Sequence, residues 1–129
     1  MENQSYSEII NFLDIYEKDK DKYSKFKIAF LKNITIDSIV PYLKFLSYRE
    51  KIFLEVFLGE YDNVFQETFD SNSKLYDFGP EIIVLTLKLE NMSAKLVNDF
   101  ANLNKSKIKT EIKFIKKTVL NIFNFSFKY

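Results

Sequence analysis

The stretch EIIVLTL, residues 81–87, is the clearest strand in the sequence. Five consecutive residues, from Ile82 to Thr86, are apolar or β-branched, a run typical of a β-strand. Gly79 and Pro80 stand just before it. They indicate the end of a helix, since glycine can adopt the left-handed cap and proline cannot continue the helix.

Three other segments are predicted strands: the apolar runs 26–31 and 53–58, and the alternating stretch FNFSF at 123–127. The segments between the strands carry helix spacing or helix boundaries. At the N-terminus, Ser5 and Glu8 have the spacing of a capping box, which predicts a helix before the first strand. A long helix, broken near Asn104, is predicted after the third strand.

Strands separated by helical segments pair in parallel and are joined by right-handed crossovers. The sequence therefore predicts an α/β fold, a three-layer α/β/α doubly wound parallel sheet of about four strands in the order 2-1-3-4. Residues 1–25 are predicted to form an N-terminal helix and a charged linker, and residues 26–129 the α/β domain.

The composition excludes several functional classes. The 129 residues include no His and no Cys, so the chain alone has neither a Ser-His-Asp nor a Cys-His mechanism, and no disulfide framework. With a net charge of +1, its overall charge predicts neither a nucleic-acid nor a membrane partner. The polar N-terminus and the lack of a long apolar run make the expected location cytoplasmic. The carboxylate pairs along the chain do not select a metal.

In a doubly wound sheet, ligands bind beyond the carboxyl ends of the strands, where the winding direction reverses. In the order 2-1-3-4, this crevice lies between the first and third strands. Its rim supplies the candidate ligand-binding residues Asn33, Thr35, Asp37, Glu90 and Asn91. Each residue also has a plain structural role, as a turn or cap residue or in a solvated loop. As a set, they could hold a carboxylate, a phosphate or a phosphopantetheine arm.

A lysine cluster marks the C-terminal helix. The segment 105–117 contains a single acidic residue, Glu111, and six lysines: Lys105, Lys107, Lys109, Lys113, Lys116 and Lys117. This face is either simply solvated or docks an acidic partner helix, with Lys113, Lys116 and Lys117 as the candidate contacts. Nucleic acid fits this cluster less well, since no nucleic-acid motif accompanies it.

The stretch 27–91 contains a group of motifs with a family likeness. They are Asn-x-Thr at 33–35, Pro-Tyr-Leu at 41–43, Gly-x-Tyr at 59–61, Asp-Ser-x-Ser-x-Leu-Tyr at 70–76, and Gly-Pro at 79–80 before an apolar strand. With these motifs the stretch resembles the N-terminal region of FkbH-like proteins of the HAD superfamily, and Asn124-Phe125 resembles that family's next strand. The resemblance implies an SGNH-hydrolase-like, flavodoxin-like fold that precedes a HAD-type catalytic domain.

The resemblance also implies a function. FkbH-like enzymes are associated with loading a glycerate-derived unit onto an acyl carrier protein, in polyketide or surface-polysaccharide biosynthesis. The Asp-x-Asp-x-Thr motif of the HAD domain is absent from this chain, so Mg²⁺ would belong to that other domain. The chain is then expected to be a non-catalytic accessory domain, C-terminally truncated relative to the family, whose partners are the HAD domain and the carrier protein.

Two alternatives remain beside the accessory role. SGNH esterases place a nucleophilic serine after the first strand; the nearby hydroxyl here is Thr35, so the chain could be a divergent acyl or glyceryl hydrolase or transferase that uses Thr35. The block that would carry the histidine base is missing. In addition, an exposed C-terminal strand with Phe123, Phe125 and Phe127 could pair with another copy or with a missing domain.

Overall fold

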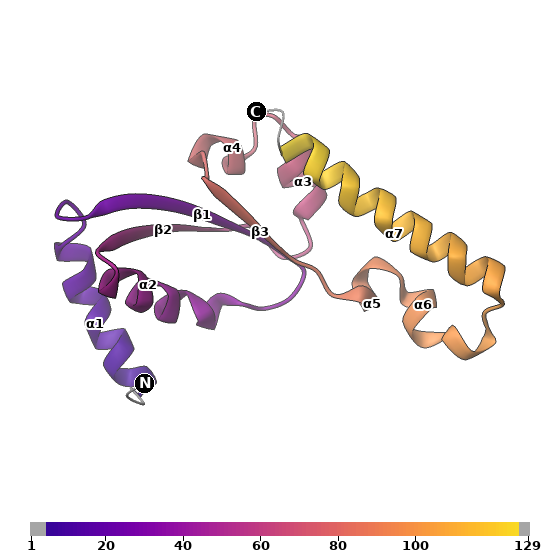
Figure 1. The fold of residues 1–129 in the computed structure, drawn as a ribbon, viewed down its shortest axis with the longest axis horizontal. Helices are drawn as coiled ribbons and strands as arrows, with labels where there is room; N and C mark the ends of the chain where they lie inside the picture. Colours follow the sequence, from indigo (N-terminus) through magenta and orange to yellow (C-terminus); the bar gives the residue numbers. More distant parts are fainter. Residues whose placement is uncertain (1–4, 127–129) are drawn as a thin grey trace.

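The computed structural model describes residues 5–126 and contains one parallel sheet with helices on both sides (Figure 1). Its strands are β1 (Ser24–Lys32), β2 (Ile52–Leu58) and β3 (Ile82–Thr86). The order across the sheet is β2-β1-β3, and both pairings are parallel. The α/β class and the parallel sheet are therefore confirmed.

The helices are α1 (Tyr6–Lys18), α2 (Val40–Arg49), α3 (Val64–Phe69), α4 (Lys74–Phe78), α5 (Leu89–Met92), α6 (Ala94–Asn98) and α7 (Lys105–Ser126), with 3-10 turns η1 (Asp37–Ile39) and η2 (Phe100–Asn102). In Figure 1, α1 and α2 lie on one side of the sheet, and α3, α4 and α7 lie on the other. This places the sheet between two helical layers.

Short-range sequence features position these helices. The predicted capping box is present: the Glu8 amide donates to Ser5 Oγ, and the Ser5 amide donates to Glu8 Oε2. Gly79 ends α4 with φ 61°, the left-handed conformation that glycine adopts without strain. Asn104 accepts a hydrogen bond from the Lys107 amide at 2.9 Å and so starts α7. The break near Asn104 is confirmed, but three short helical turns take the place of one helix before it.

The core lies on both faces of the central strand β1. Ala29 and Leu31 point to the side of α3, α4 and α7, where they pack with Val64, Leu75 and Ile122. On the α1 side, Phe12 meets Phe45 edge to face with ring centroids 5.2 Å apart, and Tyr16 stacks on Phe53 at 4.7 Å. The aromatic residues therefore form much of the contact between α1, α2 and β2.

The predicted fourth strand is wrong. Residues 123–126 are the last turn of α7, and Phe127 lies outside the described residues. The pattern that alternates Phe with polar residues spans only five positions, which is a weak basis for predicting a strand. Ile108, Ile115 and Ile122 recur at helical spacing and form an apolar stripe on α7. Ile122 is buried against the sheet, and this packing favours a helix through the end of the segment. The four-strand order 2-1-3-4 is accordingly not confirmed, since the described residues form three strands.

Within residues 5–126, no helix combines the length and the apolar character needed to cross a bilayer.

Candidate functional site

The carboxyl ends of β1 and β3 meet at Asn33, the first residue after β1. Its amide donates to the carbonyl of Thr86 at 3.1 Å, and its side-chain Oδ1 accepts from the Lys88 amide at 2.6 Å. Its carbonyl accepts from Asn91 Nδ2 at 3.1 Å. Parallel neighbours end at the same edge of a sheet, and these three bonds fasten the two chain segments there. The expected meeting of Asn33 and Asn91 is present in this geometry.

A pocket of about 230 Å³ opens beside this junction. It lies where β1 and β3 end and is bordered by side chains of α3 and α7. Its lining consists of Asn33, Asp62, Val64, Phe65, Leu87, Asn91, Met92, Phe114 and Thr118. The lining is mostly apolar, with a few polar groups, as in many small-molecule sites.

The other three residues of the predicted rim do not line this pocket. Asp37 accepts a hydrogen bond from Lys32 Nζ at 2.7 Å, and this bond holds the pKa of Asp37 below its usual value. Glu90 is paired with Lys88 at 3.1 Å. Thr35 is exposed, and its hydroxyl has no hydrogen-bond partner among residues 5–126. A nucleophilic hydroxyl needs a base within hydrogen-bond reach, so the described geometry gives Thr35 no such activation.

Two residues of this region were missed by the sequence analysis. Lys32 is only 7% exposed and reaches Asp37 from the end of β1. Asp62 has a positive φ of 57°, and its amide donates to the Lys32 carbonyl at 3.0 Å. Aspartate tolerates the left-handed region better than most residues, so the turn after β2 brings its carboxylate to the pocket. The motif Gly-x-Tyr at 59–61 ends one residue before Asp62, and it did not indicate which residues lie near Asp62 in space.

Among the described residues, no cluster of three or more acidic, His or Cys side chains could hold a metal ion. Pocket chemistry therefore rests on amide, hydroxyl and single carboxylate groups.

The model of the FkbH N-terminal domain family matches residues 27–128 of this chain. The chain belongs to the FkbH N-terminal domain family. Among solved structures, the N-terminal part of the protein BF1531 from Bacteroides fragilis, containing a phosphatase domain complexed with Mg, is similar in fold, with a TM-score of 0.67 at 17% sequence identity. The similarity covers 92% of this chain but only 30% of that one, so the chain spans less than a third of its neighbour's length. No curated protein matches in sequence.

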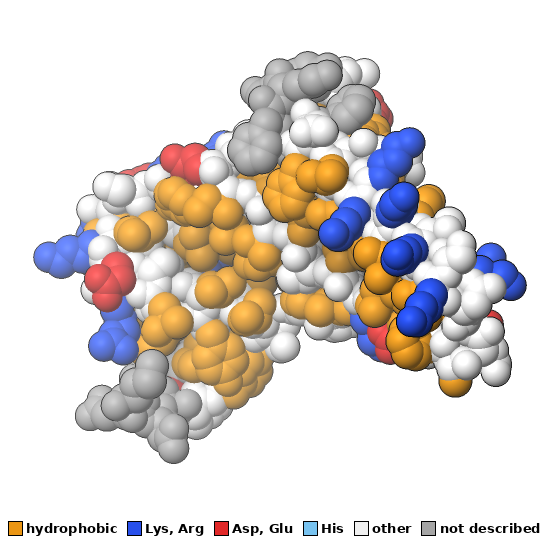
Figure 2. Space-filling model, turned by 45° about the vertical axis from the view of Figure 1, so that its right-hand side comes forward, with side chains coloured by type: hydrophobic (Ala, Val, Ile, Leu, Met, Phe, Trp, Pro, Cys, Tyr) orange, Lys and Arg blue, Asp and Glu red, His pale blue; other side chains and the backbone are white. Residues whose placement is uncertain are grey.

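Outside the pocket, this FkbH N-terminal domain carries an exposed basic face on α7. The lysines at 105, 107, 109, 113, 116 and 117 are all exposed, and none forms an ion pair with a described residue. Glu111 is engaged elsewhere, since its Oε2 accepts from Ser93 Oγ at 2.9 Å. Leu120, 59% exposed, follows on the same outward side of the helix. Figure 2 shows the row of basic side chains with hydrophobic ones between them.

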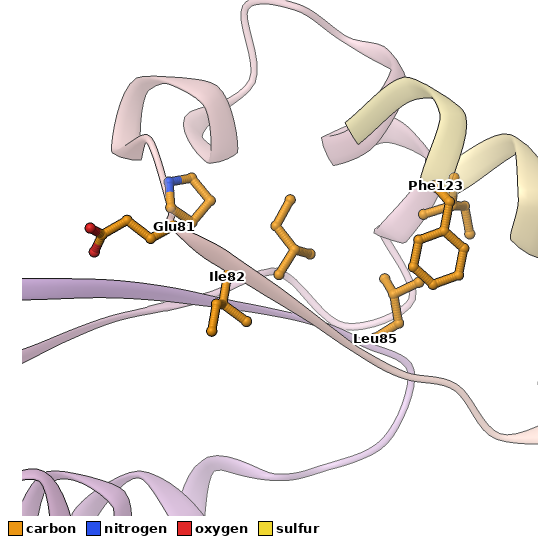
Figure 3. Close-up of a pocket in the computed structure, with 7 residues that line it drawn as sticks. Glu81, Ile82, Leu85 and Phe123 are labelled. Carbon is orange, nitrogen blue, oxygen red and sulfur yellow. The ribbon is translucent and has the colours of Figure 1, made fainter. Parts of the chain in front are cut away.

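A second hollow, of about 380 Å³, runs between the start of β3 and the end of α7. Figure 3 shows Phe123 and Leu85 on one side of it and Ile82 at the strand. Glu81 is turned to β1, where its Oε2 accepts from the Lys27 amide at 2.8 Å. The predicted pairing surface of Phe123, Phe125 and Phe127 is thus corrected: Phe123 belongs to a helix that borders this hollow, and the side chains of Phe125 and Phe127 lie outside the described part.

Proposed function

We propose that this chain is a non-catalytic accessory domain of an FkbH-like, HAD-superfamily protein, and that its α7 docks the acyl carrier protein onto which a glycerate-derived unit is loaded. Family membership supports the setting, and the phosphatase domain in the similar Bacteroides fragilis protein supports a HAD-type partner domain. In this proposal the chemistry, and any Mg²⁺, reside in that partner domain.

The observation that carries the docking role is the unpaired basic face of α7. Six exposed lysines lie within residues 105–117, and the spacing of a helix puts all of them except Lys107 on one side of α7. No described carboxylate forms an ion pair with them. An acidic partner helix would complement this charge and gain association rate from it. Leu120 offers an apolar contact one turn beyond the last of these lysines, and interfaces combine apolar contacts with polar ones.

The docking role is tested by titrating the purified chain with its cognate acyl carrier protein. The triple variant Lys113→Glu, Lys116→Glu, Lys117→Glu should weaken binding at least tenfold, about 1.4 kcal/mol, and the wild-type affinity should fall as salt is added. The matched control reverses three exposed lysines elsewhere, Lys18, Lys20 and Lys74. An unchanged affinity in the α7 variant, or an equal loss in the control, would rule out this face.

The competing proposal is a hydrolase or transferase that uses Thr35. It has less support, since Thr35 has no described base beside it. Short p-nitrophenyl esters test it directly: we expect hydrolysis no faster than in buffer. Turnover that Thr35→Ala abolishes would overturn the non-catalytic role.

A further inference from the structure

The pocket beside β1 and β3 contains one buried amide group whose orientation is fixed. Asn33 is only 4% exposed. Its side-chain oxygen accepts the short bond from the Lys88 amide, which only the oxygen of the carboxamide can do. The other terminal atom, Nδ2, must therefore be the nitrogen, which is a donor of two hydrogen bonds.

This nitrogen has no acceptor among residues 5–126. The bonds of Asn33 to described residues use its backbone amide, its carbonyl and Oδ1. Nδ2 is also not fully enclosed by protein atoms. Among the described residues, Glu67 Oε2 is the one side-chain polar atom that is both fully enclosed and without a hydrogen-bond partner, so Nδ2, which has no partner, must retain some accessible surface. Since Asn33 lines the pocket, the pocket is the space from which an acceptor would reach this donor. An unsatisfied donor at such a place favours a ligand with an acceptor.

The remaining lining restricts the ligand. Val64, Phe65, Leu87, Met92 and Phe114 supply apolar walls. Asp62 is the one charged side chain among the lining residues, and it is negative. A carboxylate or phosphate would meet this charge without a cation to balance it. The volume of about 230 Å³ suits a compound of only a few carbon atoms.

We propose that this pocket binds a small, uncharged acyl compound whose carbonyl oxygen accepts a hydrogen bond from Asn33 Nδ2. The acyl chain packs between Phe65 and Phe114, whose rings are otherwise 47% and 59% exposed. This inference concerns a site apart from the lysine face of α7. The sequence analysis suggested an anionic ligand for the rim of this crevice. The ligand proposed here is instead a neutral ester, thioester or amide.

Three matched probes test the proposal on the ¹⁵N-labelled chain: methyl butyrate, butyl methyl ether and the butyrate anion. The side-chain NH₂ signals of Asn33 in a ¹H–¹⁵N spectrum report on the donor itself. We expect methyl butyrate to shift these signals saturably at millimolar concentration. Butyl methyl ether, which lacks the carbonyl, and butyrate, which is charged, should bind several-fold more weakly.

The variant Asn33→Asp keeps the oxygen that accepts from Lys88 and removes the donor, so it should fold and lose affinity for methyl butyrate at least tenfold. Thr118→Leu fills the pocket from α7 without touching the β1–β3 junction and should also abolish binding, even if Asn33→Asp proves unstable.

Equal affinity for ether and ester, tighter binding of butyrate, or no saturable shift would each overturn the proposal. All measurements use the chain alone, so their outcome is separate from the carrier-protein titration.

Discussion

The phenol oxygen of Tyr16, in α1, is hydrogen-bonded to both backbone groups of Leu54, in β2. It donates to the Leu54 carbonyl at 3.1 Å and accepts from the Leu54 amide. β2 is an edge strand of the described sheet, and half of the backbone groups of such a strand have no neighbouring strand to pair with. Tyr16 is fully buried, so one helix side chain both fills the core and satisfies this edge.

Tyr16→Phe should therefore destabilise the fold although the ring is retained. The substitution leaves the buried Leu54 amide without its acceptor, which costs about 1–3 kcal/mol. The free energy of unfolding from urea titration measures the effect, and Tyr6→Phe, at an exposed position of the same helix, is the control. A loss at Tyr16 no larger than that at Tyr6 would show that the two bonds to Leu54 contribute nothing net.

The tyrosines of this layer also predict how stability depends on alkaline pH. Tyr48 donates to Asp19 Oδ2 at 3.0 Å, and this bond raises the pKa of Tyr48 to about 12. Burial raises the pKa of Tyr16 as well. An unfolded tyrosine loses its proton near pH 10, to within about a unit. The folded chain keeps protons that the unfolded chain has released, so stability should be complete below about pH 10 and fall towards about pH 12.

Urea unfolding of the wild type and of Tyr48→Phe across this interval isolates the contribution of Tyr48. The difference in unfolding free energy between the two proteins should shrink as the pH rises. A difference that stays constant through the interval would contradict the raised pKa.

The sequence predicted those elements whose local pattern agrees with their packing. EIIVLTL forms β3, and the Ser5–Glu8 box starts α1, because the local preference and the tertiary contacts favour the same structure. At 123–126 the two disagree. A period-2 pattern over a few residues predicts a strand, whereas burial of Ile122 on the sheet requires the helix. No short window could reveal that contact.

The candidate site shows the same division. Topology alone placed Asn33 and Asn91 at neighbouring strand ends, so their proximity could be predicted. Asp62 follows the other neighbour of β1, and it reaches the pocket only through a left-handed turn. The predicted first strand ended at residue 31, one residue before Lys32, and the bond of Lys32 to Asp37 depends on how the chain leaves β1. Such contacts come from loop geometry, which residue spacing does not encode.

Gly59, directly after β2, leaves little room for a side chain. A Cβ there would lie 3.1 Å from Leu31 Cδ2 and 3.2 Å from the Phe30 carbonyl oxygen. Gly59→Ala should cost about 1–3 kcal/mol through overpacking, and Gly59→Asn more. Gly79 provides the contrast, since a Cβ there would make only an ordinary contact, 3.9 Å from the Tyr76 carbonyl oxygen, but the φ of 61° is left-handed. Gly79→Asn should therefore be milder than Gly79→Ala. Thermal unfolding of Gly59→Ala, Gly59→Asn, Gly79→Ala and Gly79→Asn measures these effects. If asparagine destabilised the fold less than alanine at Gly59, this account would be contradicted.

Glu67 should be a residue whose removal stabilises the fold. It is 7% exposed, and its Oε2 is fully enclosed without a hydrogen-bond partner among the described residues. Burying a polar group without a hydrogen-bond partner costs free energy. An apolar side chain of similar shape at the same position does not carry this cost. Glu67→Met should raise the free energy of unfolding by about 1–2 kcal/mol. Glu60→Met, which removes the same charge at an exposed site, should change it by no more than about 0.5 kcal/mol.

Urea midpoints at neutral pH, with unchanged m-values, measure both effects. A Glu67→Met variant that is less stable than the wild type would contradict the expected gain.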